Sequence, residues 1–295
     1  MRVTESRLHD IATSSLTKAR SEVARSGAEL SSGIRVQRPS DDPVAFAEGA
    51  RVAAKQTIAN AHKSSIARSR ERLQATEGAL QTIGDTLLRI TELAIQGANE
   101  TCAGTARISL AVEIRELRQA ALNAVNTQAE DGTYLFGSFG NDTPPFDAAA
   151  TYAGGTATRQ ADVGPGLVLP ASLPGSVLTT LAGPSAENVF GVIDNIEAAL
   201  AADNGDGVTA ELDRLQRAVR QVALARGSAG GYVQALETAE ETRAKLMESL
   251  VEIRARAISA DPIEAATSLA KAENSLEAAR LSAQELLAAA ALGGR

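Results

Sequence analysis

Apolar residues recur at alternating steps of three and four positions over most of this chain. Such spacing places side chains on one face of an α-helix and is typical of helices that pack along their length. It predicts long helices before and after a middle segment with a different pattern. Runs of this spacing begin at Leu73, Ile108, Val189 and Val233. The cleanest run lies near the C-terminus and consists of Leu269, Ala272, Leu276, Ala279, Ala283, Leu286 and Ala290.

The segment 131–185 has another composition. It holds nine of the 24 glycines, six of the nine prolines and a single basic residue, Arg159. Glycine and proline punctuate turns, and the short apolar runs "GLVLP" and "SVLTTLAG" predict strands and turns between them. We therefore expect a small β-rich insert. Its first third carries most of the aromatic side chains of the chain: Tyr134, Phe136, Phe139, Phe146 and Tyr152.

The N-terminal residues repeat the helical spacing with smaller side chains, at Leu8, Ala12, Ser15, Ala19 and Leu30. Apolar burial contributes roughly 25 cal/mol per Å², so an Ala/Ser stripe stabilises far less than a Leu stripe. We expect the helices at both chain ends to be weakly packed in an isolated molecule and to become fully ordered when a neighbouring chain covers them.

These patterns predict a mainly α fold, in which both chain ends form a long antiparallel helical rod or coiled-coil bundle and the β-rich insert lies in the middle. Five segments are expected: an N-terminal helix and loop, long rod helices, the insert, return helices and a C-terminal core helix. Their boundaries are 1–42, 43–130, 131–185, 186–258 and 259–295.

Composition narrows the class of protein. Aromatic residues make up only 3% of the chain, so the core is expected to consist of Ala, Leu, Val and Ile. The net charge of −7 argues against a nucleic-acid partner. No apolar stretch is long enough to predict a membrane span, and no secretory leader is visible. The single cysteine, Cys102, excludes an internal disulfide and is expected to be a small buried hydrophobe.

The stretch "LSSGIRVQRPSDDPVA", residues 30–45, contains two adjacent carboxylates that could suggest an acid pair or a metal site. The backbone favours another interpretation. A residue before proline is held in the extended region that a helix N-cap needs, so Asp42 is expected to cap a helix beginning at Pro43. Ser40 and Asp41 offer an alternative cap and a negative charge at the positive helix end, and Gly33 is expected to end the preceding helix.

Other candidates for chemistry are weak. His9 and His62 are expected on helix surfaces without further ligands at metal-binding spacing. The "DNGDG" run at 203–207 lacks the later acidic positions of a calcium loop and predicts a plain turn. No nucleophile elbow, P-loop or dinucleotide fingerprint occurs. We expect no catalytic residue, cofactor or metal, and hence no enzyme.

The motifs together resemble the bacterial flagellin family. The opening "MRV", then "LSSG", a basic "RV" and "DDP" before a helix are similar to the start of that family, and "EAATSLAKAENSLEAARLSAQELLAAAALGGR" is similar to its C-terminal helix. Within the family, "DGTYLFGSFGNDTPPF" at 131–146 and "ENVFGVIDNIEAAL" at 187–200 resemble the hook-associated members that join hook and filament.

The resemblance implies a structural component of the flagellum, assembled by self-association of its terminal helices after type III export without a cleaved signal peptide. It implies as partners a ring of copies of the same chain, the other hook-associated junction protein, flagellin and a flagellar export chaperone, in an extracellular location without membrane insertion. A minor flagellin that polymerises into the filament itself is the alternative. A coiled-coil scaffold unrelated to flagella fits the apolar spacing but leaves "LSSGIRV" and "SDDP" unexplained.

The residues expected to form the interface between subunits come from the N-terminal stripe, the loop and the C-terminal stripe. Arg35 and Arg38 are expected to pair with acidic side chains of an adjacent copy. The full set is Leu8, Leu30, Arg35, Arg38, Asp41, Asp42, Leu269, Leu276 and Leu286.

Overall fold

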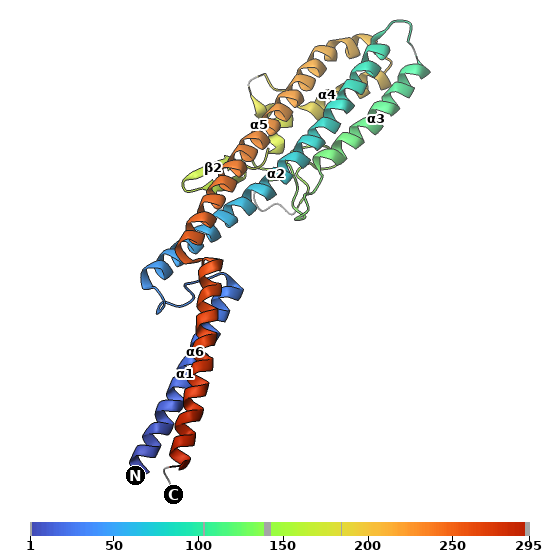
Figure 1. The fold of residues 1–295 in the computed structure, drawn as a ribbon. Coiled ribbons are helices and arrows are strands. Elements are labelled where there is room, and N and C mark those ends of the chain that lie inside the picture. Colours follow the sequence, from blue (N-terminus) through green and yellow to red (C-terminus); the bar gives the residue numbers. More distant parts are fainter. Residues whose placement is uncertain (1, 103, 139–142, 184, 293–295) are drawn as a thin grey trace. The chain divides into compact units, whose positions relative to one another are not determined.

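The computed structural model describes residues 2–102, 104–138, 143–183 and 185–292, and the chain is mainly helical (Figure 1). The predicted mainly α fold with a small β component is confirmed. In order, the elements are α1 (Arg2–Ser32), α2 (Pro43–Ala98), α3 (Thr105–Val125), β1 (Gln160–Gly164), β2 (Leu167–Pro170), the 3-10 helices η1 (Gly175–Leu178) and η2 (Thr180–Ala182), α4 (Val189–Ala201), α5 (Gly205–Ile258) and α6 (Pro262–Leu292).

The chain divides into two compact units. One unit comprises residues 1–58 and 246–295, and it contains α1 and α6. The other comprises residues 59–245, and it contains α3, α4 and the small sheet. The long helices α2 and α5 contribute residues to both units.

The core of the 59–245 unit is formed by apolar faces of α2, α3, α4 and α5. Their spacing follows the sequence stripes, since Ile83, Leu87 and Ile90 of α2 are fully buried. A Cβ at Gly84 would lie 3.8 Å from Val222, so α2 and α5 pack closely here. The other helices contribute buried residues at the same helical spacing: Leu110, Ile114, Ala121, Val125, Ile193, Ile196, Leu200, Leu215, Ala218 and Val222.

The insert holds an antiparallel pair of short strands, β1 and β2, with Ala161 opposite Leu169. Ala161 and Val163 of β1 are buried in a second apolar cluster with Ile66 and Leu236, so the sheet packs on α2 and α5. "GLVLP" therefore forms a strand as predicted. The "SVLTTLAG" run does not, because the Thr179 hydroxyl accepts a hydrogen bond from the Leu181 N–H at 3.2 Å and caps η2.

The prediction for His62 was wrong in one respect. Its side chain is only 14% exposed, and its Nε2 lies 3.7 Å from the Asp162 carboxylate of β1. The helical spacing around His62 could not reveal this burial, because the strand that covers it follows about a hundred residues later in the chain. His9, in contrast, is exposed as expected.

The aromatic residues at the start of the insert anchor it to the helices. Phe146 is 1% exposed, and its ring centroid lies 5.1 Å from that of Tyr152 and 5.6 Å from that of Phe190 in α4. The Asn126 side chain fixes the backbone of Phe146 by donating to its carbonyl at 3.0 Å and accepting from its N–H at 3.1 Å. The "TPPF" segment is therefore an anchoring point between insert and helices.

The turn between α4 and α5 is a plain turn, as the sequence predicted. The Asp203 carboxylate accepts hydrogen bonds from the Gly104 N–H at 3.0 Å and from the Arg107 guanidinium at 2.8 Å. Arg107 is buried and also donates to the carbonyl of Gly97 at 2.8 Å. These bonds hold the turn against the α2–α3 connection, where Cys102 packs half-buried against the core.

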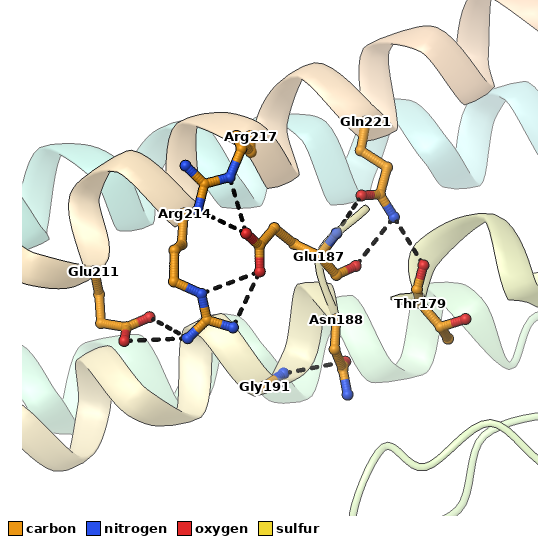
Figure 2. A network of polar contacts seen from close by, with 8 residues as sticks. All are labelled: Thr179, Glu187, Asn188, Gly191, Glu211, Arg214, Arg217 and Gln221. Atoms are coloured by element: carbon orange, nitrogen blue, oxygen red, sulfur yellow. Dashed lines mark hydrogen bonds and ion pairs between the residues drawn. The ribbon is translucent and has the colours of Figure 1, made fainter. Parts of the chain in front are cut away.

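A polar network fastens the segment before α4 to α5 (Figure 2). Glu187 accepts from Arg217 at 2.9 Å and from Arg214 at 3.0 Å, and its N–H donates to the Gln221 side chain at 2.8 Å. The Gln221 amide in turn donates to the carbonyl of Val177 at 2.8 Å. Glu187 therefore attaches this segment to three side chains of α5.

Acid is expected to loosen this attachment. Burial raises the pKa of Glu187, but the bonds from Arg217 and Arg214 outweigh it and bring the pKa below the ordinary value of 4.5. Because the folded pKa is lowered, the contribution of Glu187 to stability is present above pH 4.5 and is lost as pH falls through the folded pKa. Unfolding free energies measured by denaturant titration across this acid range should decline more steeply for the wild-type chain than for Glu187→Gln.

The Glu187→Gln variant is also expected to be less stable at neutral pH, since Arg217 loses its anionic partner and Arg214 keeps only Glu211. As a control, Glu241→Gln changes an exposed α5 carboxylate outside this network and should leave the acid decline unchanged. Equal acid declines in the wild-type chain and Glu187→Gln would contradict this role of Glu187.

Candidate subunit interface

The loop that follows α1 is fixed by backbone hydrogen bonds. Gly33 has a φ of 67°, and its N–H donates to the Glu29 carbonyl at 2.9 Å, which ends the helix as predicted. The Arg35 N–H donates to the Ile258 carbonyl at 2.8 Å, and Val36 is buried at 3% exposure. The loop is thereby attached to the turn between α5 and α6.

Asp41 and Asp42 both accept backbone hydrogen bonds. Asp42 Oδ1 accepts from the N–H groups of Val44 at 3.1 Å and Ala45 at 3.0 Å, which confirms Asp42 as the N-cap of α2. Asp41 Oδ2 accepts from the backbone of Arg38 at 2.9 Å and of Gln37 at 3.1 Å. The bond from Arg38 is the main cause that lowers the pKa of Asp41 below its ordinary value of 3.8.

The same device begins α6 and was missed from the sequence. Asp261 precedes Pro262, and its Oδ1 accepts from the Ile263 N–H at 2.8 Å. The signal was present, because "ADPIEA" repeats the Asp-Pro order of "DDPVA". Two capped helix starts therefore flank the joint where the loop meets the α5–α6 turn.

The geometry of this joint supports a structural role. The carboxylates serve helix caps and turns, while the Arg35 and Arg38 side chains are exposed. Arg35 lies 3.7 Å from the Asp42 carboxylate, a distance and exposure at which an ion pair contributes little to stability. Both guanidinium groups therefore remain accessible to a partner.

Helices α1 and α6 lie side by side, with both chain ends at the same end of the pair (Figure 1). A Cβ at Gly27 would lie 4.0 Å from Leu269. Ala12 and Ala19 are buried, but Ser15 is exposed and Leu30 is 39% exposed. The inward face of α1 continues instead through Leu16, Val23 and Ser26, which keep the three- and four-residue steps.

On α6 the expected stripe does face the partner helix. Ala272 and Ala283 are buried, and Leu269, Leu276 and Leu286 are half-buried. The side chains of Leu8 and Ala290, also part of the expected stripes, lie outside the described residues. The structure therefore brings the α6 leucines against α1, whereas Leu30 and the loop arginines stay at the surface.

Large apolar side chains remain exposed on this same unit. Ile11 of α1 is 59% exposed and Leu281 of α6 is 58% exposed, while Val44 and Ile263, just after the two Asp-Pro starts, are 80% and 79% exposed. The α1–α6 pair thus buries mainly small residues against itself and leaves some of its largest apolar groups in water.

Over the residues described, no group of three or more His, Cys, Asp or Glu side chains could hold a metal ion. No helix in this part of the chain has the length and apolar character to cross a bilayer.

Charge reversal at the loop is expected to weaken assembly without unfolding the monomer. Arg35→Glu with Arg38→Glu changes two exposed side chains, so the unfolding free energy should fall by less than about 1 kcal/mol. Filament growth, counted by electron microscopy of cells, should drop, because the expected interface would then carry two carboxylates in place of two cations. Arg35→Lys with Arg38→Lys preserves both charges and should grow filaments; wild-type growth of the Glu variant would refute an interface role.

Comparison with known proteins identifies relatives of this chain. Residues 6–139 match the family described as the bacterial flagellin N-terminal helical region. Flagellar hook-associated protein 3 of Escherichia coli (strain K12) is 26% identical over 246 residues, which cover 76% of this chain and 77% of the relative. The resemblance to the bacterial flagellin family is confirmed.

One further relative and one solved structure extend the comparison. A flagellin of Salmonella rubislaw is 33% identical over 146 residues, which cover 45% of this chain and 28% of the flagellin. The solved structure of the flagellar junction protein FlgL from Legionella pneumophila shares the fold with a TM-score of 0.58 at 15% identity, covering 72% of this chain and all of that one.

Proposed function

We propose that this chain is a structural component of the bacterial flagellum that forms the junction between hook and filament. The observation that carries the proposal is the alignment with a hook-associated protein 3 over about three quarters of both chains. The match reaches well beyond the N-terminal flagellin region. Phe146 ends the motif "TPPF" and Phe190 lies in "ENVFGVIDN". Their rings are in contact, so the two motifs pack against each other in the fold.

Assembly would use the terminal helices. In this proposal α1 and α6 form a coiled-coil pair, and neighbouring copies cover side chains such as Ile11 and Leu281 that a single chain leaves exposed. Arg35 and Arg38 would reach acidic groups of the next copy across the joint. Ordering the ends only on assembly costs several kcal/mol of contact energy and would delay polymerisation until after export.

The partners in this proposal are a ring of copies of the same chain, a second hook-associated junction protein, flagellin and a cytoplasmic export chaperone. The chain would leave the cell through the flagellar export channel without a cleaved signal peptide. We also propose the five-segment division at 42, 130, 185 and 258; limited proteolysis should cut first near these boundaries.

A minor flagellin is the second candidate, and the 33% identity with a flagellin over 146 residues favours it. Immunogold labelling of intact flagella separates the two functions. A single band at the hook–filament boundary supports the junction protein, whereas uniform decoration of the filament would show a flagellin. Absence of label from flagella would overturn both.

A further inference from the structure

In the 59–245 unit, the described residues leave a groove open on α5. We define the α5 groove by Leu173, Val177, Arg217, Arg220 and Leu224, and its volume is about 630 Å³. Leu224 stands 74% exposed in it, although Ala225 beside it is buried. The groove therefore combines an apolar wall with a basic rim.

The basic rim contains one arginine, Arg220, without a neighbouring carboxylate among the described residues. Arg217 pairs with Glu187, and Arg214 pairs with both Glu187 and Glu211, as Figure 2 shows. Arg220 is exposed and forms no ion pair with the described residues. Gln221 donates to the Val177 carbonyl, which holds one wall in place. A rigid apolar groove with spare positive charge suits an apolar partner that carries acidic groups.

Another surface of the same unit has this complementary chemistry. We define the α2–α3 strip by Leu88 and Ile95 of α2 and Ile108 and Val112 of α3, which are 54%, 58%, 50% and 49% exposed. The Arg89–Glu113 ion pair at 2.8 Å lies beside Leu88 and Val112 and ties the two helices together.

The strip carries more acid than base. Asp85, Glu92 and Glu116 are exposed on these two helices, and of the three only Glu92 has an ion pair among the described residues, with Arg89 at 2.8 Å. The α2–α3 strip thus offers apolar side chains with spare negative charge.

We propose that the α2–α3 strip of one copy docks in the α5 groove of the next copy. The inference rests on the proposed function, because it names the lateral contact of an assembly of identical chains. Charge decides the pairing: groove against groove would oppose arginines, and strip against strip would oppose carboxylates. The contact is therefore heterologous, and repeated contacts of this kind close into a ring or extend as a helix.

Cysteine cross-linking in assembled flagella tests this contact. In a Cys102→Ala background, Leu224→Cys and Ile95→Cys place one thiol in the groove and one in the strip, both at exposed positions. A short bis-maleimide tolerates thiols too far apart for a disulfide. The double variant is expected to give a ladder of multimers. Each single variant should give only monomers, and a mixture of the two single variants should give dimers and nothing longer.

Val168→Cys with Leu224→Cys is the control, since Val168 is 53% exposed on β2 outside both surfaces and should give no ladder. The same variants are also treated as purified full-length chains at high concentration, in case the altered chains do not assemble in cells. Loss of the ladder from the double variant in both settings, or dimers from either single variant, would overturn the contact. Gold labelling at the junction without a ladder would leave the proposed function intact, and a ladder without junction label would refute only that function.

Discussion

Replacing Leu276 and Leu286 of α6 with Asp is expected to abolish filament growth while the 59–245 unit stays folded. Both side chains are half-buried on the face of α6 that contacts α1. Full burial of a leucine contributes about 1.5–3 kcal/mol, so losing two half-buried leucines removes about 2 kcal/mol before any cost of placing charges there. A helix pair that otherwise buries mainly alanine has little contact energy to replace this loss.

Electron microscopy of flagella and motility on soft agar measure the assembly defect, and thermal unfolding followed by circular dichroism measures the remaining fold. Leu167→Asp is the matched control, because Leu167 is 50% exposed on β2 and lies in the other unit. The control should grow filaments. Normal filaments from the Leu276→Asp, Leu286→Asp chain would exclude α6 as an assembly element.

Phe146→Ala is expected to destabilise the 59–245 unit by about 3–5 kcal/mol, the range for removing a buried aromatic ring from a core. Phe146 is 1% exposed and contacts the rings of Tyr152 and Phe190, so its loss would leave a cavity between insert and helices. Denaturant unfolding followed by circular dichroism gives the change in free energy. The insert should also become more sensitive to protease, because Phe146 anchors its first half.

Phe146→Leu is the comparison variant, because it removes the aromatic ring but leaves a large apolar side chain in the site. It keeps most of the apolar volume and the Asn126 bonds to the backbone, so it should cost less than about 1.5 kcal/mol. Equal losses for the leucine and alanine variants would mean that the ring does not fill the site as the structure indicates.

At the joint between the α1–α2 loop and the α5–α6 turn, the end of α1 and the start of α2 were predictable to the exact residue. Gly33 ends α1, and Asp42 caps α2 at Pro43, because the backbone preferences of glycine and of a residue before proline act within a few positions. The C-terminal stripe was predictable for the same reason, since its leucines and alanines repeat over many turns. The "SVLTTLAG" segment was not, because the Gln221 side chain, which holds it by donating to the Val177 and Thr179 carbonyls, comes from the distant helix α5.

The N-terminal stripe shows where periodicity alone becomes ambiguous. Ala12 and Ala19 face α6 as predicted, but the face continues through Leu16 and Val23 rather than Ser15 and Leu30. Small and polar side chains carry too little contrast in hydrophobicity to choose between faces a third of a turn apart. Only the packing of α6 against α1 selects the inward one.

The sequence by itself determined the long helices, the capped start of α2 and the resemblance to flagellins, because these depend on neighbours within a few turns or on motifs read in order. The tertiary structure alone decided which faces are buried and which stay open. His62 is buried because β1, about a hundred residues later in the chain, lies over it. The α5 groove and the α2–α3 strip stay exposed because no distant segment among the described residues covers them. Such long-range packing leaves no periodic trace in any single segment.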